Sequence, residues 1–185
     1  GSNTVGQTAP VVILVRPQMG EHIGAAARVM YNFQLESLRI VAPRDGWPNT
    51  KADAMAAHGI SVVEKAQIFE TVEEAVADLQ YILAVTARLR DMDKPVYEAR
   101  ESVVATQHTG KTGWLFGPER SGLTNEEVSR ADAILTILVH PECPSLNLSQ
   151  AVGIVAYEWF MTTQDGTLSE IQESDAASKQ DIIGM

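Results

Sequence analysis

The fold class is indicated first by one stretch near the N-terminus, Val11-Val12-Ile13-Leu14-Val15-Arg16-Pro17-Gln18-Met19-Gly20-Glu21-His22-Ile23-Gly24-Ala25-Ala26-Ala27-Arg28. Its first five residues form a short, continuous and mostly β-branched apolar run, which is typical of a strand buried on both faces. Residues 16–20 read as a loop. From His22 onward, apolar residues recur at a helical period, at Ile23, Ala27 and Met30. A buried strand followed by an amphipathic helix is the repeating unit of an α/β sheet.

The same alternation continues along the chain. Further strands are predicted at 38–42, 60–63, 81–86, 113–117 and 134–139, and helices at about 50–57, 71–79, from 124 and from about 147. Thr71 and Thr124 each stand three residues before a glutamate, which is the pattern of a capping box. Residues 87–112 are mostly polar, so we expect a loop there, alone or followed by a short helix. The pattern predicts an α/β domain with a mainly parallel sheet flanked by helices.

The domain organisation is simple. Residues 1–9 are polar and are expected to be disordered, and Gly1-Ser2 is typical of an expression scar. Residues 10–161 carry the alternating pattern and form one domain. Residues 162–185 are polar and acidic and are expected to be a tail or linker.

Composition excludes several classes of protein. The 185 residues are 45% hydrophobic, which is ordinary for a globular domain, and the net charge of −10 argues against nonspecific adhesion to nucleic acid. No apolar run approaches the roughly 20 residues of a membrane span, so we expect no membrane partner. The single cysteine, Cys143, excludes an internal disulfide and fits a reducing compartment, so we expect a cytoplasmic protein.

Most of the unusual chemistry lies where ligands bind in parallel sheets, beyond the carboxyl ends of strands. Four segments are expected there: 16–24, 86–94, 117–123 and 140–147. None contains the glycine-rich dinucleotide fingerprint or the Gly-Lys-Ser/Thr end of a P-loop, which argues against the usual dinucleotide enzymes and nucleoside triphosphatases.

Each segment alone has a structural interpretation beside the functional one. The glycines and alanines of 20–28 fit tight packing of the helix on the sheet, or a helix N-terminus that holds an anion together with Arg28. Glu119 and Arg120 fit a surface ion pair in a turn. Ser145 or Asn147 fits the N-cap of the last helix.

The remaining histidines, the cysteine and one glutamate in an apolar helix also suggest possible sites. His140 and Cys143 have the spacing of two zinc ligands, but no second pair stands near them, so we expect no metal. His58 and His108 lie in polar sequence and are expected to be solvated. Glu158, inside an apolar helix, is expected to be a hydrogen-bonded carboxylate or an interface residue.

Together the segments are more specific than any one of them. Gly20 to Arg28, Leu115 to Leu123 and Ser145 to Val152, continuing to Glu158, resemble in order and spacing the three motifs of the SpoU-type RNA ribose 2′-O-methyltransferases of the SPOUT superfamily. The resemblance covers about residues 10–161. With Thr86-Ala87-Arg88, it is greatest to the branch that methylates cytidine or uridine in the tRNA anticodon loop. That branch has a C-terminal extension, of which residues 162–185 would be a truncated start.

The resemblance implies a SPOUT fold with a deep C-terminal trefoil knot, a homodimer, a tRNA as the RNA substrate, and S-adenosylmethionine held in the knot loops. The implied cofactor site consists of Thr86, Ala87, Arg88, Gly117, Ile137, Pro144, Ser145 and Leu146. The implied catalytic residues are Arg28, Glu119, Ser145 and Asn147. RNA-binding residues are expected at Arg16, His22, Arg28 and Arg120. The dimer surface is expected on the small residues 24–27 and on the apolar last helix.

Two positions depart from the family pattern. Asparagine is usual where His22 stands, and proline is usual where Leu138 stands. His22 would lie beside the RNA phosphate, so this change raises the alternative of an RNA-binding protein of the same fold that is catalytically weakened.

The expected reaction needs a ribose hydroxyl to lose its proton while it is held in line with the methyl group. An arginine guanidinium hardly ever deprotonates, so we expect Arg28 to bind a phosphate and stabilise developing negative charge rather than act as the base. The sequence leaves the base open among the phosphate, water and another side chain. An α/β protein that binds some other nucleotide remains a third alternative.

Overall fold

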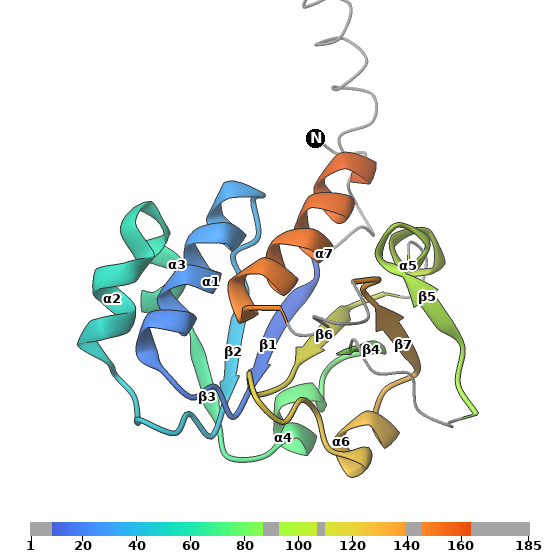
Figure 1. Cartoon of the computed structure of the whole chain (residues 1–185), viewed down its shortest axis with the longest axis horizontal. Coiled ribbons are helices and arrows are strands. Elements are labelled where there is room, and N and C mark those ends of the chain that lie inside the picture. The colour runs from blue at the N-terminus through green and yellow to red at the C-terminus, as the bar shows by residue number, and fades with distance from the viewer. Residues whose placement is uncertain (1–8, 87–92, 107–109, 140–145, 164–185) are drawn as a thin grey trace, which may run out of the picture.

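The chain forms a seven-stranded sheet in which every neighbouring pair of strands is parallel (Figure 1). The computed structural model describes residues 9–86, 93–106, 110–139 and 146–163. The strand order is β3-β2-β1-β6-β4-β7-β5. The strands are β1 (Val11–Val15), β2 (Leu38–Val41), β3 (Gln67–Phe69), β4 (Tyr81–Thr86), β5 (Val96–Glu98), β6 (Thr112–Phe116) and β7 (Ala133–Thr136). The predicted α/β class with a mainly parallel sheet is confirmed.

Helices cover both faces of the sheet, so the domain has three layers (Figure 1). One core joins the sheet to α1 (Gly20–Asn32), α2 (Thr50–Ala56), α3 (Ile60–Glu64), α5 (Ala99–Thr106) and α7 (Leu148–Thr163). A second core joins the opposite face to α4 (Val72–Val76) and α6 (Asn125–Ser129). Because both faces are covered, β1, β2, β6 and β7 are buried along their whole length, as their apolar runs predict.

The small residues of α1 let α2 approach its backbone. A Cβ atom at Gly24 would lie 2.2 Å from the carbonyl oxygen of Ala52, and one at Gly59 would lie 2.7 Å from the carbonyl oxygen of Ala27. Ala26 and Ala27 are fully buried. The predicted tight packing is confirmed, although the close approach at Gly24 is to α2 and not to the sheet. Gly24, Ala26 and Ala27 are buried within the chain, so they cannot form the expected dimer surface.

Three element predictions differ from the structure in whole or in part. Residues 60–63 lie in the helix α3, and the strand that follows is β3. In the region 87–112 the short helix is confirmed as α5, but the edge strand β5 before it was not predicted. The strand predicted at 134–139 is β7, which ends at Thr136.

The predicted helix starts at the two threonines are confirmed. Thr124 and Glu127 form a reciprocal capping box at α6, and the hydroxyl of Thr71 accepts a hydrogen bond from the backbone N–H of Glu74 at α4. Among the described helices, none is long and apolar enough to cross a membrane.

Candidate active site

The carboxyl ends of three neighbouring strands bring together residues that are distant in sequence. β4 lies between β6 and β7, with Val85 in register with Phe116 and Thr86 in register with Thr136. Thr86, Gly117 and Ile137, which end or follow these strands, therefore occupy one segment of the sheet edge. The sequence assigned all three to a single cofactor site, and the structure places them together.

Gly117 is required by the loop that follows β6. A Cβ atom there would lie 2.4 Å from the backbone nitrogen of Leu123, a contact that real side chains do not make. The loop turns back at Gly122, whose N–H donates to the carbonyl of Pro118 at 2.9 Å and whose φ is +69°. The glycines at both ends of this segment thus form a compact turn beside β4.

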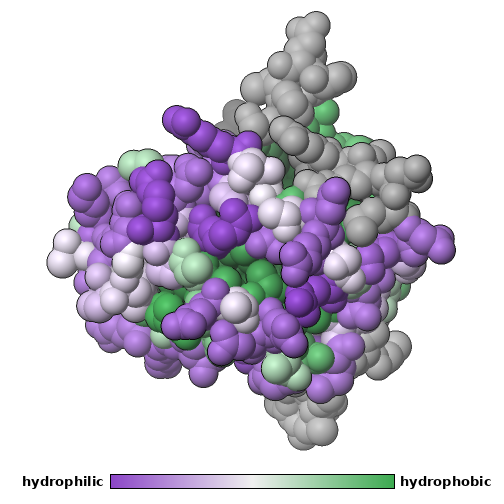
Figure 2. Space-filling view, turned by 90° about the horizontal axis from the view of Figure 1, so that it is seen from below, coloured by the Kyte–Doolittle hydropathy of each residue, from purple (hydrophilic) through white to green (hydrophobic). Residues whose placement is uncertain are grey.

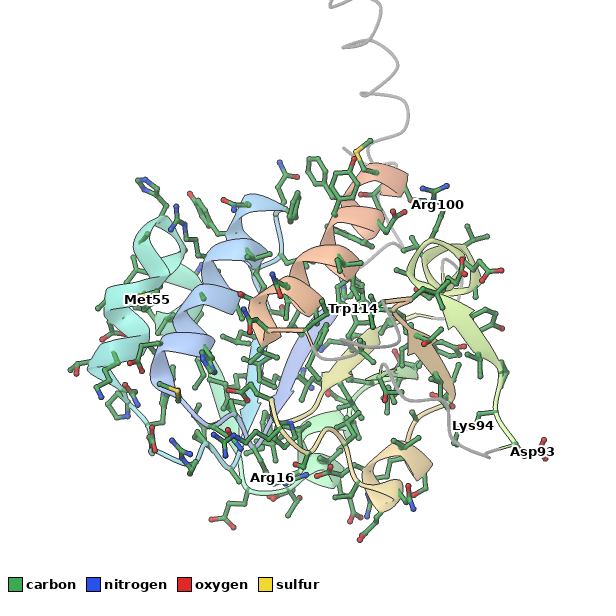
Figure 3. All side chains as sticks on the ribbon, in the orientation of Figure 1. Arg16, Met55, Asp93, Lys94, Arg100 and Trp114 are labelled. Carbon is green, nitrogen blue, oxygen red and sulfur yellow. The ribbon has the colours of Figure 1, made fainter. Side chains whose placement is uncertain are left out.

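The surroundings of this edge are apolar. Ile137 is buried, and Leu146, just before α7, packs against the main core. Figure 2 views the molecule from the side on which Arg16 lies in Figure 3, and apolar residues reach the surface in the middle of this side, bordered by hydrophilic ones. Ile137 and Leu146, with the backbone of Gly117 beside them, suit a flat, uncharged ring system.

Glu119 is held between two segments at this edge. Its Oε2 contacts Nδ1 of His22, in the first turn of α1, and its Oε1 accepts a hydrogen bond from the N–H of Gln18 at 3.4 Å. The carboxylate side chain is only 11% exposed, whereas the His22 ring is 40% exposed. The two residues are 97 positions apart, so no local pattern could pair them.

Arg16 is engaged by a carboxylate rather than left free. It follows β1 with φ +49°, and its guanidinium makes two hydrogen bonds to Glu127, of 3.1 and 2.8 Å. Burial raises the pKa of Glu127, but the hydrogen bonds from Arg16 and Thr124 outweigh it, so that the pKa lies below its ordinary value. This bidentate pair ties the loop after β1 to α6.

A cleft of about 450 Å³ lies beside that pair. Its lining includes two arginines, Arg16 and Arg130, and four glutamates: Glu70, Glu73, Glu126 and Glu127. Arg130 also forms ion pairs with Glu73 and Glu126. The excess of acidic groups makes this side of the edge unsuited to an RNA backbone.

Arg28 and Arg120 are exposed, as the sequence predicts for side chains that meet a ligand. Arg28 leaves α1 on its polar side, and among the described residues it has no ion-pair partner. Asn147 is exposed just before α7, and its carbonyl accepts the N–H of Ala151 at 3.0 Å, so it occupies the N-cap position.

Several predicted residues lie outside the described part of the chain: Ala87, Arg88, Pro144 and Ser145 of the site, together with His108, His140 and Cys143. The loops on which a knot depends also include undescribed residues. Within the described ranges, no group of three or more His, Cys, Asp or Glu side chains could hold a metal ion.

Two polar predictions outside the site can be compared with the structure. His58 is exposed, as predicted. Glu158 is partly buried and accepts a hydrogen bond from Arg100 of α5 at 3.2 Å, so it is the hydrogen-bonded carboxylate that its sequence context indicates.

The chain is similar to known methyltransferases over most of its length. Residues 9–157 match the family described as "SpoU rRNA Methylase family". A tRNA (cytidine-2′-O-)-methyltransferase TrmJ of Methanocaldococcus jannaschii is 33% identical over 92% of this chain and 75% of its own length. A tRNA (cytidine/uridine-2′-O-)-methyltransferase TrmJ of Salmonella typhimurium is 33% identical over 88% of this chain and 70% of its own. The crystal structure of TrmJ from Z. mobilis ZM4 is 43% identical, with a TM-score of 0.80, over 91% of this chain and 82% of that one.

Proposed function

Because the chain belongs to the SpoU rRNA methylase family, we propose that it transfers a methyl group from S-adenosylmethionine to a ribose 2′-hydroxyl of RNA, with tRNA as the substrate. The observation that carries this proposal is the match over residues 9–157, which contains all three motifs. The relatives named for methylation of cytidine or uridine in tRNA favour the same nucleotides here. The resemblance of Thr86-Ala87-Arg88 to one branch of the family favours a position in the anticodon loop.

The described part of the sheet edge fits the cofactor. Thr86, Gly117, Ile137 and Leu146 would hold it, together with Ala87, Arg88, Pro144 and Ser145, in the loops of a trefoil knot. The apolar side chains of Ile137 and Leu146 and the turn from Gly117 to Gly122 suit an adenine ring. When bound, the cofactor supplies a methyl group on a sulfonium, which is electrophilic enough to need no metal.

The chain's own residues bind and orient the RNA. Arg28 has five N–H donors in a planar fork and no competing partner among the described residues, so it would bind the phosphate next to the target ribose. Its charge would also stabilise the oxyanion that develops as the hydroxyl is deprotonated. Asn147, and Ser145 before it, would position the ribose from the start of α7.

The assembly that we propose is a homodimer. The C-terminal end of α1 and the outer side of α7 share an aromatic cluster, in which the Phe33 ring lies 5.8 Å from those of both Tyr157 and Phe160. Tyr31, Ile154 and Tyr157 in this region are exposed. Contiguous exposed aromatic groups of this kind mark interfaces, and a second copy of the chain would cover them.

The test is incubation with labelled S-adenosylmethionine and unmodified tRNA, with ribosomal RNA in parallel. Label in tRNA, at an anticodon-loop nucleotide, is the expected result. Binding of both cofactor and tRNA without transfer would instead support the catalytically weakened RNA-binding protein. Absence of cofactor binding at millimolar concentration would refute the proposal. Light scattering tests the dimer separately, and a 20 kDa species at micromolar concentration would refute it.

A further inference from the structure

The contact between His22 and Glu119 joins α1 to the turn from Gly117 to Gly122 that follows β6. Nδ1 of the His22 ring contacts Oε2 of Glu119, and Oε1 of the same carboxylate accepts the N–H of Gln18 at 3.4 Å. The Glu119 side chain is only 11% exposed. Two segments, the loop after β1 and the first turn of α1, therefore hold one nearly buried carboxylate.

The hydrogen in this contact belongs to the ring. An ionised carboxylate only accepts hydrogen bonds, so Nδ1 of His22 is the donor. The ring nitrogen acts here as an amide N–H would act. Holding Glu119 in this way requires no transfer of a proton.

The same carboxylate lies at the N-terminal end of α1, a helix of 13 residues that lacks a side-chain cap of its own. Met19, at the N-cap position, makes no side-chain hydrogen bond to the first N–H groups. The partial positive charge at a helix N-terminus favours an anion such as the Glu119 carboxylate. The contact therefore stabilises both the start of α1 and the position of the turn.

Loss of the ring donor would leave the Glu119 charge poorly compensated. An ionised carboxylate that is buried without a partner is costly, and breaking such a pair by removing one member is strongly destabilising. The remaining contact, from the N–H of Gln18, is long at 3.4 Å. The turn would have to shift until the carboxylate reached water, and Gly117, in the same turn, would shift with it.

Asparagine, which is usual at the position of His22, can make the same contact. Nδ1 of histidine and Nδ2 of asparagine are each bonded to Cγ, so both side chains place an N–H donor at a similar distance from the backbone. Leucine has the branched shape of asparagine but no donor. The three side chains therefore separate the effect of the donor from the effects of ring and shape.

We infer that His22 is a positioning residue for cofactor binding: its ring replaces an asparagine amide as the donor that holds Glu119, and through Glu119 it holds the turn that carries Gly117. This inference rests on the proposed function, in which Gly117 lines the cofactor site. Neither side chain takes a proton from the ribose in this role. Histidine is then an equivalent replacement in the framework of the site, and it gives no reason to expect a weakened enzyme.

The first test measures cofactor affinity without RNA, so it needs no methyl transfer. Calorimetry with S-adenosylhomocysteine, the demethylated cofactor, compares two substitutions of the same shape. His22→Leu should weaken binding by about 10-fold, because it leaves the carboxylate without its side-chain donor. His22→Asn restores the donor and should bind within about threefold of the wild type. His58→Leu, the same substitution at an exposed histidine, is the matched control and should bind as the wild type does.

The second test asks whether the effect passes through Glu119. Glu119→Ala removes the charge together with its need for a donor, so adding His22→Leu to it should weaken cofactor binding no further. Binding is measured at a temperature at which circular dichroism shows every variant to be folded. Losses that add in the double variant would mean that His22 acts on the cofactor by another route, and would overturn the inference.

The outcomes separate the inference from the function on which it rests. If the wild type binds the cofactor and His22→Leu binds it equally well, the inference fails alone. Equal losses in His22→Asn and His22→Leu would show that the ring does more than donate to Glu119, and would also overturn it. If the wild type binds no cofactor at millimolar concentration, the proposed function fails and the inference fails with it.

Discussion

Two arginines of the domain differ in how they are engaged. On the polar side of α1, Arg28 is exposed and has no ion-pair partner within the described residues. At the amino edge, Arg39 of β2 has a side chain only 8% exposed and makes two hydrogen bonds to Asp78, of 2.7 and 3.0 Å. It also donates to the carbonyl of Ala75 at 2.6 Å and lies over the Phe69 ring.

This difference distinguishes a structural cation from a binding one. Lys111 also binds Asp78, at 2.8 Å, so both cations share one carboxylate within the chain. Arg39 makes three hydrogen bonds within the chain and buries its Nε, which has no hydrogen-bond partner among the described residues, so it is not accessible to a ligand, whereas the exposed Arg28 has no ion-pair partner among those residues. The comparison therefore favours the exposed side of α1 around Arg28 for the proposed contact with RNA.

The largest expected effect follows from removing the free arginine. Arg28→Ala should lower methyl transfer by about 10²–10³-fold, because it deletes a preorganised contact to phosphate and to developing charge. Cofactor affinity by calorimetry and the melting temperature should stay near wild type. Arg28→Lys should rescue poorly, since an ammonium lacks the planar fork. Weakened cofactor binding with a normal rate at saturating cofactor would contradict the prediction, because it would show that Arg28 binds the cofactor and not the RNA.

The next effect concerns the helix that carries Arg28. Gly24→Ala should lower the free energy of unfolding by about 3 kcal/mol, since the new methyl group would collide with the Ala52 carbonyl and push α1 from α2. Urea denaturation measures it. Gly153→Ala is the control, because its Cβ would meet only a side-chain atom, Cγ1 of Val29, at 3.3 Å. Equal stability of the two variants would contradict the close packing of α1 on α2.

Removing the side chain of Arg39 should lower the free energy of unfolding and leave the methyl-transfer rate unchanged. Arg39→Ala should cost about 2 kcal/mol, because the buried Ala75 carbonyl loses its donor. At a temperature where the variant is folded, its methyl-transfer rate should equal that of the wild type. Arg130→Ala, which breaks only surface pairs with Glu73 and Glu126, should change stability by less than about 1 kcal/mol. A rate loss in Arg39→Ala with intact folding would mean that the amino edge also serves the reaction.

The smallest expected effect is a pH dependence. Hydrogen bonds from Arg39 and then Lys111 hold the pKa of Asp78 well below its ordinary value of 3.8. A carboxyl whose pKa is lower in the folded state stabilises the protein above the unfolded-state pKa and loses that contribution as the pH falls below it. Asp78→Asn should therefore be less stable than the wild type at pH 7, and the gap should shrink below about pH 4. Asp78 is 53% exposed, so the gap should be smaller than that of Arg39→Ala. A stability difference between the wild type and Asp78→Asn that stays constant down to pH 2 would contradict the lowered pKa of Asp78.

Sequence patterns predicted the centre of the sheet and failed at its edges. The strands β1, β4 and β6 are buried and apolar, so their runs identify them. The edge strands β3 and β5 have exposed residues and no such run. The apolar run 60–63 fits a strand or a buried helix turn equally well, and only its packing against α1 determines that it forms α3.

Sequence reasoning could place segments of the candidate site at one edge but could not pair their side chains. The rule that parallel strands share a carboxyl edge was enough to place Thr86, Gly117 and Ile137 in one region. The partners of Arg16 and His22 lie 111 and 97 positions away, so no periodicity could reveal them. Consequently Arg16, expected to bind RNA, proved to be engaged by Glu127, and the contact between His22 and Glu119 became visible only in the structure.

The central claim, methylation of a ribose in tRNA at the carboxyl edge, is tested most directly by nucleoside mass spectrometry of tRNA after reaction with S-adenosylmethionine. Wild type and the Arg28→Ala variant should be compared under identical conditions. The account predicts a new 2′-O-methylated cytidine or uridine with the wild type and almost none with the variant. Methylation of a base instead of a ribose, or equal ribose methylation by both proteins, would contradict it.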